Sequence, residues 1–268
     1  MTDPPALVTL TTDFGEQDAY VAAMKGVILS RAPRTAVIDL SHAIPPQACF
    51  EAAYFLAGAV PWFPPGAVHV VVVDPGVGTE RRAIAARWRD QILIAPDNGV
   101  LTLLDQQRPL DAVRRIDHPD CRLEPMSATF HGRDLFAPTA GLIAAGFPFK
   151  RVGPLLADPV HLPLARPETR PEGIVGAVIH IDRFGNAITN LPADRFSGDQ
   201  PVRITAGTVE VTDIRRTYGD AAPGETLALI GSTGHLEIAV NQGHAAQRLG
   251  LHRGMAVWVR PIPSDTCR

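Results

Sequence analysis

Short β-rich runs alternate with stretches of helical spacing over the first 150 residues, and this alternation limits the possible folds more than any other feature. Residues 7–12, 35–40 and 67–74 have the β-branched and apolar character of strands, while segments beginning near 18 and 47 carry apolar residues at helical spacing. The run at 67–74, AVHVVVVD, is almost continuously apolar, as expected for a strand buried on both faces. Strands that alternate with helices predict a mostly parallel α/β sheet.

The rest of the first half contains a hairpin and further helices. Residues 83–87 and 91–96 are two strands close enough in sequence to pair, residues 97–99 open a helical stretch, and a last helix is expected from 134 to 145. We therefore predict an N-terminal α/β domain over residues 1–150.

A proline-rich segment follows that domain. Six prolines lie between Phe147 and Gly173, at positions 148, 154, 159, 163, 167 and 171. Proline fixes φ and lacks a backbone N–H, so this density excludes regular helix and most strand. We predict that residues 151–172 form a linker between two domains.

Beyond the linker, short β-rich runs are separated by Gly, Asp and Pro. This pattern is typical of a small antiparallel sandwich or barrel. The expected fold is therefore α/β, with a mostly parallel N-terminal sheet domain and a smaller C-terminal antiparallel β domain over 173–268. The expected strands are 174–182, 202–206, 226–230, 236–240 and 255–259.

The composition excludes some classes of partner. The chain has 268 residues and a formal net charge of −3, and it contains no Lys/Arg-rich run. It lacks the basic patch of a protein that binds nucleic acid or an anionic membrane, so a small molecule is the expected partner. No stretch approaches the ~20 apolar residues of a membrane span, and no signal peptide is apparent, so we expect a cytoplasmic protein. Cys49, Cys121 and Cys267 lack the spacing of a metal site or disulfide framework, and we expect free thiols and no metal.

Polar residues directly after strands are candidates for ligand contacts, because ligands of open α/β sheets bind outside the carboxyl ends of the strands. Asp13, Asp39 and Asp74 occupy such positions. For a single aspartate, a helix cap or a turn is the more common role. We interpret Asp39, which is followed by Ser41-His42, as structural.

Asp74 begins the segment Asp-Pro-Gly-Val-Gly-Thr-Glu-Arg-Arg at residues 74–82. A Pro-Gly-x-Gly turn can return the chain so that Arg81 or Arg82 faces Asp74. One alternative is a surface salt bridge of little energetic value. Phosphate binding is another alternative, but the Gly-Lys-Ser/Thr ending of a P-loop is missing.

Two further clusters carry groups suited to a ligand site. Thr-Phe-His-Gly-Arg-Asp at 129–134 places His131 just before a helix, although a lone histidine is more often structural. Ile-Asp-Arg-Phe-Gly-Asn at 181–186 offers a carboxylate, a stacking ring and an amide, although Gly-Asn is equally typical of a hairpin turn.

These clusters, with the opening Thr-Thr-Asp-Phe-Gly and the late segment Gly-Ser-Thr-Gly-His-Leu-Glu-Ile-Ala-Val-Asn-Gln-Gly at 231–243, resemble the S-adenosyl-L-methionine (SAM) hydroxide adenosyltransferases. These SAM hydrolases are relatives of the SAM-dependent fluorinase and chlorinase. The resemblance covers nearly the whole chain. It implies a fluorinase-like fold of an α/β domain and an antiparallel β domain, and a homotrimer with active sites between subunits.

The resemblance also implies site residues. An Asp, Arg and His set handles the water in the hydrolases, and the matching catalytic positions are Asp74, Arg81 and His131, with Arg82 as the alternative arginine. Halogenase relatives carry other residues at the positions of Asp74 and His131, which favours water over halide. An aromatic residue near Pro46 in the halogenases is missing here.

Seven further residues match positions that hold the substrate in this family. They are Asp13 at the ribose hydroxyls, Asp182 and Asn186 at the amino-acid end, Phe130 and Phe184 packed nearby, and Ser232 and Glu237 at the methionine portion.

The expected reaction is the hydrolysis of SAM to adenosine and L-methionine by attack of activated water at C5′ of the ribose. The sulfonium leaves as a neutral thioether, so no acid and no cofactor is expected, whereas the weakly nucleophilic water needs help from positioned side chains. Asp74 and His131 are both candidates for the base. Two alternatives stay open: a chloride-using halogenase, and a non-catalytic protein that binds SAM or adenosine.

Overall fold

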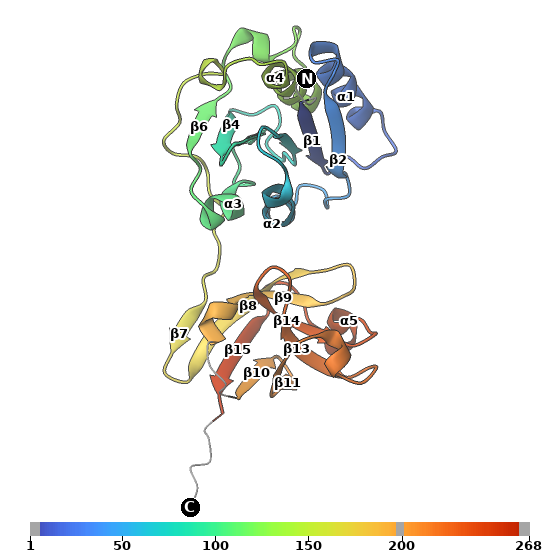
Figure 1. The fold of residues 1–268 in the computed structure, drawn as a ribbon, viewed down its shortest axis with the longest axis vertical. Helices are drawn as coiled ribbons and strands as arrows, with labels where there is room; N and C mark the ends of the chain where they lie inside the picture. The colour runs from blue at the N-terminus through green and yellow to red at the C-terminus, as the bar shows by residue number, and fades with distance from the viewer. Residues whose placement is uncertain (1–5, 197–200, 263–268) are drawn as a thin grey trace, which may run out of the picture. The chain divides into compact units, whose positions relative to one another are not determined.

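The computed structural model describes residues 6–196 and 201–262, in two compact units, Met1–Leu162 and Pro163–Arg268 (Figure 1). Each unit is described by itself. Cys49 and Cys121 are free thiols, while Cys267 lies outside the described residues. Within 6–196 and 201–262, no helix has the length and apolar character needed to cross a membrane.

Unit 1 is built on a six-stranded sheet in the order β2-β1-β3-β5-β4-β6. Strands β1, β2, β3 and β5 are parallel, and β4 runs antiparallel to both of its neighbours, as the hairpin prediction requires. The elements are β1 (Leu7–Thr12), α1 (Tyr20–Arg31), β2 (Ala36–Ser41), α2 (Cys49–Ala59), β3 (Val68–Val72), β4 (Ala83–Trp88), β5 (Gln91–Pro96), α3 (Thr102–Gln107), β6 (Ala112–Arg115) and α4 (Ala137–Ala144). Short turns of other helix types are Val60–Trp62, Pro119–Cys121, Gly132–Phe136 and Phe149–Arg151.

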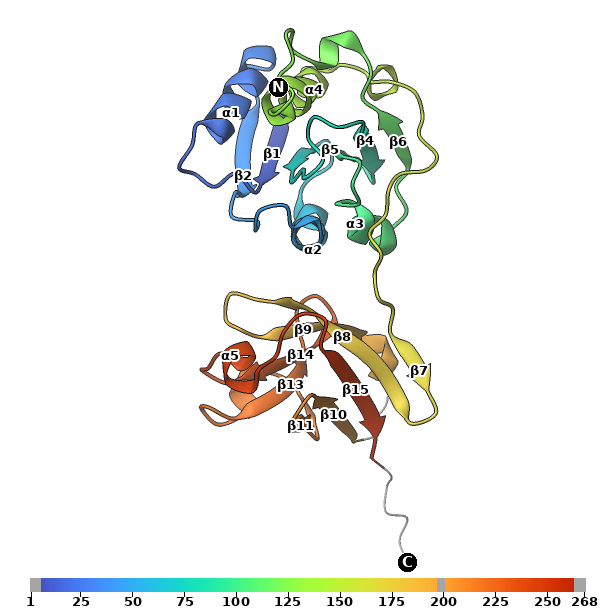
Figure 2. The ribbon, with the colours of Figure 1, turned by 180° about the vertical axis from the view of Figure 1, so that it is seen from behind.

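Helices cover both faces of this sheet, which explains the apolar run in β3. Val70 and Val72 belong to a core with α1 and α4, whereas Val71 and Val73 belong to a second core with α2 and α3. Successive side chains of a strand point to opposite faces, so a strand between two helical layers is mostly apolar along its whole length. Figure 2 shows α1 and α4 on one side of the sheet and α2 and α3 on the other.

The order of the strands creates a topological switch point between β1 and β3. The chain leaves β1 through α1 to β2 on one side, and then returns through α2 to β3 on the other side of β1. Because α1 and α2 lie on opposite faces, the loops after β1 and β3 diverge. Such a switch point is where ligands bind in open α/β sheets.

Unit 2 is a mostly antiparallel β domain, as predicted. Its strand order is β11-β10-β15-β8-β9-β14-β13-β12, with β7 paired to β8, and only β12 and β13 are parallel among the described pairs. The elements are β7 (Glu168–Arg170), β8 (Gly173–Ile181), β9 (Ala187–Pro192), β10 (Val202–Ala206), β11 (Val209–Val211), β12 (Ile214–Arg215), β13 (Thr226–Ile230), β14 (His235–Val240), α5 (Ala245–Leu249) and β15 (Ala256–Pro261), with short turns at Ala193–Phe196 and Tyr218–Asp220.

The structure differs from the sequence-based expectations in several local respects, two of which concern the linker and Asp39. Residues 151–162 of the proposed linker lie on unit 1, where Leu156 N–H donates to Val113 O at 2.9 Å, and 168–170 form β7. Asp39 lies inside β2, paired with Leu10, rather than after the strand. It forms ion pairs with Lys25 at 2.5 Å and His42 at 2.9 Å, which fits a structural role.

Candidate active site

Two aspartates lie at the carboxyl ends of the adjacent strands β1 and β3. Asp13 directly follows Thr12, whose register partner in β3 is Val72, and Asp74 comes two residues after Val72. The Gln47 N–H donates to Asp13 Oδ2 at 2.8 Å. Burial raises the pKa of the Cys49 thiol, and the charges of Asp74 and Asp13 raise it further. Cys49, at the start of α2, therefore lies within electrostatic range of both carboxylates.

The loop from Asp74 to Arg81 folds back on itself. Thr79 Oγ1 donates to Gly76 O at 2.7 Å and accepts from Arg81 N at 3.3 Å. Gly78 has φ +76°, and a Cβ there would lie 2.4 Å from Ala128 O. Gly78 thus serves both a tight return and a close backbone contact.

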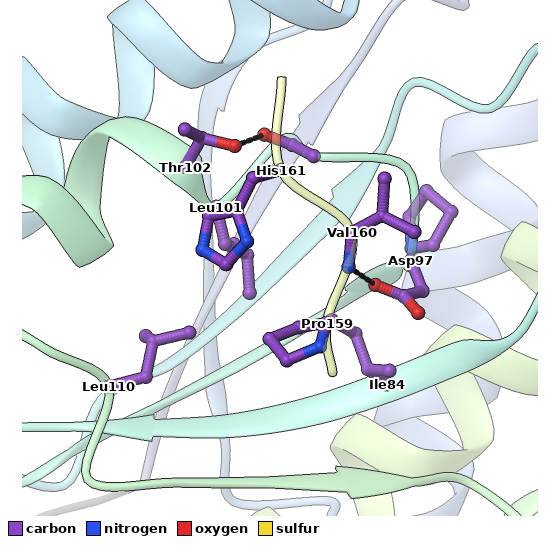
Figure 3. A pocket seen from close by; sticks show the side chains of 10 residues that line it. Ile84, Asp97, Leu101, Thr102, Leu110, Pro159, Val160 and His161 are labelled. Carbon is purple, nitrogen blue, oxygen red and sulfur yellow. Dashed lines mark hydrogen bonds between the residues drawn. The ribbon is translucent and has the colours of Figure 1, made fainter. Parts of the chain in front are cut away.

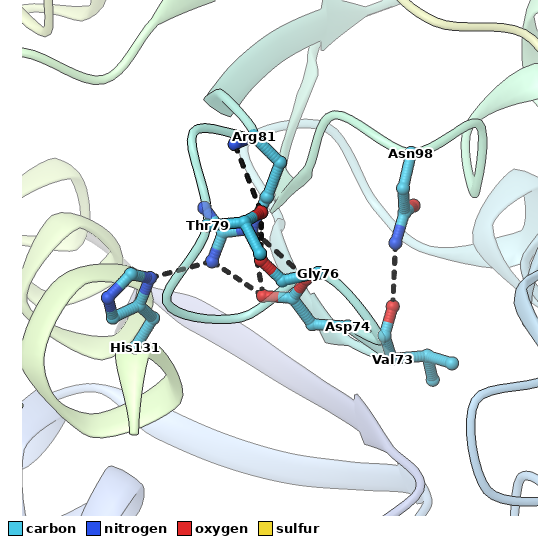
Figure 4. Close-up of polar contacts among 7 residues, drawn as sticks. All are labelled: Val73, Asp74, Gly76, Thr79, Arg81, Asn98 and His131. Atoms are coloured by element: carbon cyan, nitrogen blue, oxygen red, sulfur yellow. Dashed lines mark hydrogen bonds and ion pairs between the residues drawn. The ribbon is translucent and has the colours of Figure 1, made fainter. Parts of the chain in front are cut away.

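Arg81 is the arginine that faces Asp74 (Figure 4). Its Nε donates to both carboxylate oxygens at 3.0 Å, and its Nη2 donates to Oδ2 at 2.5 Å. The two side chains are only 11% and 4% exposed, so solvent screens the pair little. Arg82, the alternative, instead binds Asp97 and Asp158.

His131 completes a continuous chain of contacts. Arg81 Nη2 lies 2.7 Å from His131 Nδ1. Because a guanidinium has donors and no acceptor, Nδ1 must accept, and the proton of a neutral ring is on Nε2. Burial lowers the pKa of His131, and the charge of Arg81 lowers it further. The geometry and the charge both favour a neutral imidazole.

The residues after His131 form a π-helical turn, Gly132–Phe136, that continues into α4. We expected an ordinary helix from Asp134. Asp134 is buried, binds Arg133 through both oxygens and accepts the Ser127 N–H at 2.8 Å. These bonds fix the segment in front of His131, and π turns of this kind are frequent at functional sites.

Three aromatic rings pack beside these polar groups. Phe130, predicted from the sequence, lies 6.0 Å from Phe14 and 5.1 Å from Tyr20 between ring centroids. Phe14 follows Asp13 and Phe130 precedes His131, so the rings adjoin the polar site. Phe14 and Tyr20 were not predicted. Phe14 belongs to the Thr-Thr-Asp-Phe-Gly motif, which could have signalled it, whereas Tyr20 reads as an ordinary apolar helix position.

The predicted residues 182–186 form a compact turn in unit 2. Asp182 Oδ1 accepts the N–H groups of Phe184 at 2.9 Å and Asn186 at 2.8 Å, and Asn186 Nδ2 donates to Asp182 Oδ2 at 3.0 Å. Gly185, with φ +87°, allows this turn. The Phe184 ring is 74% exposed, so it is free to contact a ligand.

Glu237 lies buried on β14, and Ser232 is exposed in the turn that precedes this strand. The hydroxyl of Tyr218 donates to Glu237 Oε1 at 2.5 Å. Burial raises the pKa of Glu237, the Tyr218 bond opposes this, and Asp182 adds to it. Tyr218 was not predicted, because no pattern in the sequence ties it to a carboxylate 19 residues away.

The structure thus gathers Asp13, Asp74, Arg81, Phe130 and His131 in unit 1. Asp182 and Asn186 bind each other in unit 2, and the charge of Asp182 raises the pKa of Glu237. Among residues 6–196 and 201–262, no group of three or more His, Cys, Asp or Glu could hold a metal ion.

Models of two known protein domains match the two units of this chain separately. The model of the SAM hydroxide adenosyltransferase N-terminal domain matches residues 8–153, and that of the C-terminal domain matches 176–258. The chain is 44% identical to an (R)-S-adenosyl-L-methionine hydrolase of Thermus thermophilus, over 93% of this chain and 98% of the relative. It is 41% identical to a protein of the same name from Salinispora tropica, over 94% and 96%.

More distant relatives and solved structures extend this comparison. A fluorinase of Nocardia brasiliensis is 28% identical over 95% of this chain and 96% of the relative. A crystal structure of a Thermotoga maritima protein matches with a TM-score of 0.86 at 37% identity, covering 95% of this chain and 99% of that one. The matched domains, the identity to the hydrolases and the shared fold show that this chain belongs to the SAM hydroxide adenosyltransferase family.

Proposed function

We propose that this protein is an enzyme that hydrolyses SAM to adenosine and L-methionine. The observation that carries the proposal is the chain of contacts Asp74–Arg81–His131 at the switch point of the sheet, beside Asp13. Relatives with 40–44% identity are named (R)-S-adenosyl-L-methionine hydrolase, which supports SAM as the substrate. These names specify one configuration at the sulfonium, and we extend the (R) preference to this chain.

The reaction is an in-line displacement at C5′ of the ribose. A water oxygen forms a bond to C5′ while the C5′–S bond breaks. The electron pair of the C5′–S bond goes to the sulfur and neutralises the sulfonium. The water loses one proton, so SAM and water yield adenosine, methionine and H⁺. The developing hydroxide and the sulfonium cancel each other's charge, and a pocket of low polarity favours this cancellation. The rings of Phe14 and Phe130 supply such surroundings in unit 1.

In this proposal Asp74 receives the proton. Arg81 occupies the Nδ1 lone pair of His131, and the Nε2 of the neutral ring carries a hydrogen, so the imidazole has no free acceptor. Asp74 Oδ1 accepts one bond from Arg81 and retains a second lone pair. His131 then orients the water through Nε2–H, and Arg81 stabilises the negative charge that develops.

Asp13 is assigned to the ribose hydroxyls, and unit 2 to the rest of the substrate. The residues of unit 2 that we assign to the substrate are Asp182, Asn186, Phe184, Ser232 and Glu237. A buried carboxylate such as Glu237 suits the ammonium group at the amino-acid end of SAM. Because the assigned residues are divided between two units, we also propose the homotrimer of the family, with sites between subunits, which light scattering tests directly.

No cofactor takes part in the proposed reaction, because the leaving sulfur is already cationic and needs no acid. A cytoplasmic location is part of the same proposal. The free thiols Cys49 and Cys121 support it, since neither forms a disulfide that would need an oxidising compartment.

The test is incubation of the purified protein with each sulfonium epimer of SAM, in halide-free buffer and in high chloride, followed by chromatography. We expect adenosine and methionine from the (R) epimer without halide, and loss of both products in Asp74→Ala. A chlorinated nucleoside would instead assign the chain to the halogenases. Tight binding of SAM without any product would assign it to the binding proteins.

A further inference from the structure

Two consecutive polar residues, Asp97 and Asn98, directly follow β5, next to the proposed catalytic loop. From the sequence they only open a helical stretch. In the structure β5 pairs with β3, so both residues lie beside the carboxyl end from which Asp74 emerges. The Asp97 side chain is 1% exposed, which is costly for a carboxylate unless each of its oxygens is bonded.

Asn98 holds the start of the catalytic loop. Its Nδ2 donates to Val73 O at 2.9 Å (Figure 4). Its Oδ1 accepts the Val100 N–H at 3.3 Å. Val73 directly precedes Asp74. The carbonyl that Asn98 fixes therefore belongs to the peptide unit that leads into the Asp74 carboxylate.

Asp97 holds the other end of the same loop. Its Oδ2 accepts from Arg82 Nε at 2.6 Å, and its N–H donates to Arg82 O at 2.9 Å. Arg82 directly follows Arg81. Two adjacent residues thus fix the backbone one position before Asp74 and one position after Arg81.

Residues 157–162, which we call the strap, form hydrogen bonds with Asp97 and Arg82. Val160 N–H donates to Asp97 Oδ1 at 2.8 Å, as Figure 3 shows. Arg82 also donates to the Asp158 carboxylate at 3.0 Å and to its carbonyl at 2.7 Å. Asp97 therefore has a charged partner on one oxygen and the strap on the other.

We propose that Asp97 and Asn98 are positioning residues for the reaction, which clamp both ends of the 74–81 loop so that Arg81 reaches Asp74 and His131 together. This inference rests on the proposed function. The Nη2 of Arg81 serves both partners at 2.5 and 2.7 Å. A shift of about 1 Å would lengthen both bonds beyond effective range, and such misplacement can cost roughly 100-fold in rate.

The test compares Asn98→Ala and Arg82→Lys with a control at the opposite end of the same strand. Gln91 is buried at the start of β5, and its Nε2 donates to Val60 O at 3.3 Å and to Phe63 O at 2.6 Å. Gln91→Leu thus removes comparable side-chain bonds far from the loop. We expect kcat to fall about 10- to 100-fold in the clamp variants with KM changed less than about 3-fold, and kcat to be unchanged in Gln91→Leu.

A second readout does not depend on turnover. The ring nitrogen shifts of His131, assigned by comparison with His131→Asn, report by NMR whether Arg81 still donates to Nδ1. We expect them to move toward those of a free histidine in both clamp variants and to stay unchanged in Gln91→Leu. Unchanged shifts in the folded clamp variants, or an equal fall of kcat in the control, would overturn the clamp. If the His131 ring nitrogen shifts differ between the wild type and the clamp variants as expected, but the wild-type protein does not turn over SAM, only the proposed function is overturned.

Discussion

Arg81 donates through one nitrogen to Asp74 and to Nδ1 of His131, at 2.5 and 2.7 Å, so the arginine joins the carboxylate and the imidazole. The arrangement fixes the tautomer of the histidine by the donor character of the guanidinium. It also makes the arginine the central member of the three.

Replacement of Arg81 by lysine keeps the charge but removes the planar fork that bonds two partners at once. We expect kcat to fall on the order of 100-fold, the scale seen when one preorganised donor is lost from a site. Steady-state kinetics on SAM measures this, with circular dichroism as the control for folding. A variant that retains most of the wild-type kcat would show that charge alone suffices.

The rate should depend on pH through His131. Burial and the neighbouring charge of Arg81 lower the pKa of this ring below its ordinary value near 6.5. The neutral form therefore persists into mildly acidic solution, and kcat/KM should be level at neutral pH and decline only below about 6.5. A decline that begins above that value would mean that the pKa of the ring is not lowered, and a rise on acidification would mean that the active ring is protonated.

His69 should make folding sensitive to acid. It lies fully buried in β3, bonds to Thr9 Oγ1 at 2.7 Å, and burial lowers its pKa to about 4. The unfolded chain binds this proton near pH 6.5, so stability is fully present above that pH and is lost as pH falls toward 4. At pH 4.5 the expected loss is about 2–3 kcal/mol.

Urea unfolding of the wild type and His69→Gln at pH 7.5 and 4.5 isolates this contribution. The difference in the free energy of unfolding between the wild type and His69→Gln should shift by about 2–3 kcal/mol in favour of the variant at the lower pH. A gap independent of pH would show that His69 keeps an ordinary pKa in the folded protein.

Tyr218→Phe should weaken unit 2 by leaving Glu237 Oε1 without its donor. A buried acceptor that loses its partner costs about 1–3 kcal/mol. Urea unfolding should therefore show a loss of this size. A double-mutant cycle with Glu237→Gln should give a coupling energy well above zero, whereas additive losses would show that the Tyr218–Glu237 bond carries no stability.

Much of this architecture follows from the sequence, because it depends on local pattern. The apolar run in β3 predicts a strand between two helical layers, and the Pro-Gly-x-Gly turn predicts the return of an arginine to Asp74. The choice between Arg81 and Arg82 needed the structure. It depends on Asp97, which the register of the β4–β5 hairpin sets opposite Arg82, and the sequence pattern does not fix that register.

Other features depend on contacts between distant residues and leave no local signal. Tyr218 meets Glu237 only because the Tyr218–Asp220 turn lies against β14. Similarly, the prolines near residue 159 exclude helix but do not reveal that the strap bonds to Asp97. Short strands such as β12 contain too few residues to show a period.

The most direct measurement of the central claim is hydrolysis of SAM in ¹⁸O-labelled water, followed by mass spectrometry of both products. Attack of water at C5′ predicts that the label enters the 5′ oxygen of adenosine and that methionine contains none. Unlabelled adenosine, or products that arise without cleavage of the C5′–S bond, would contradict the account.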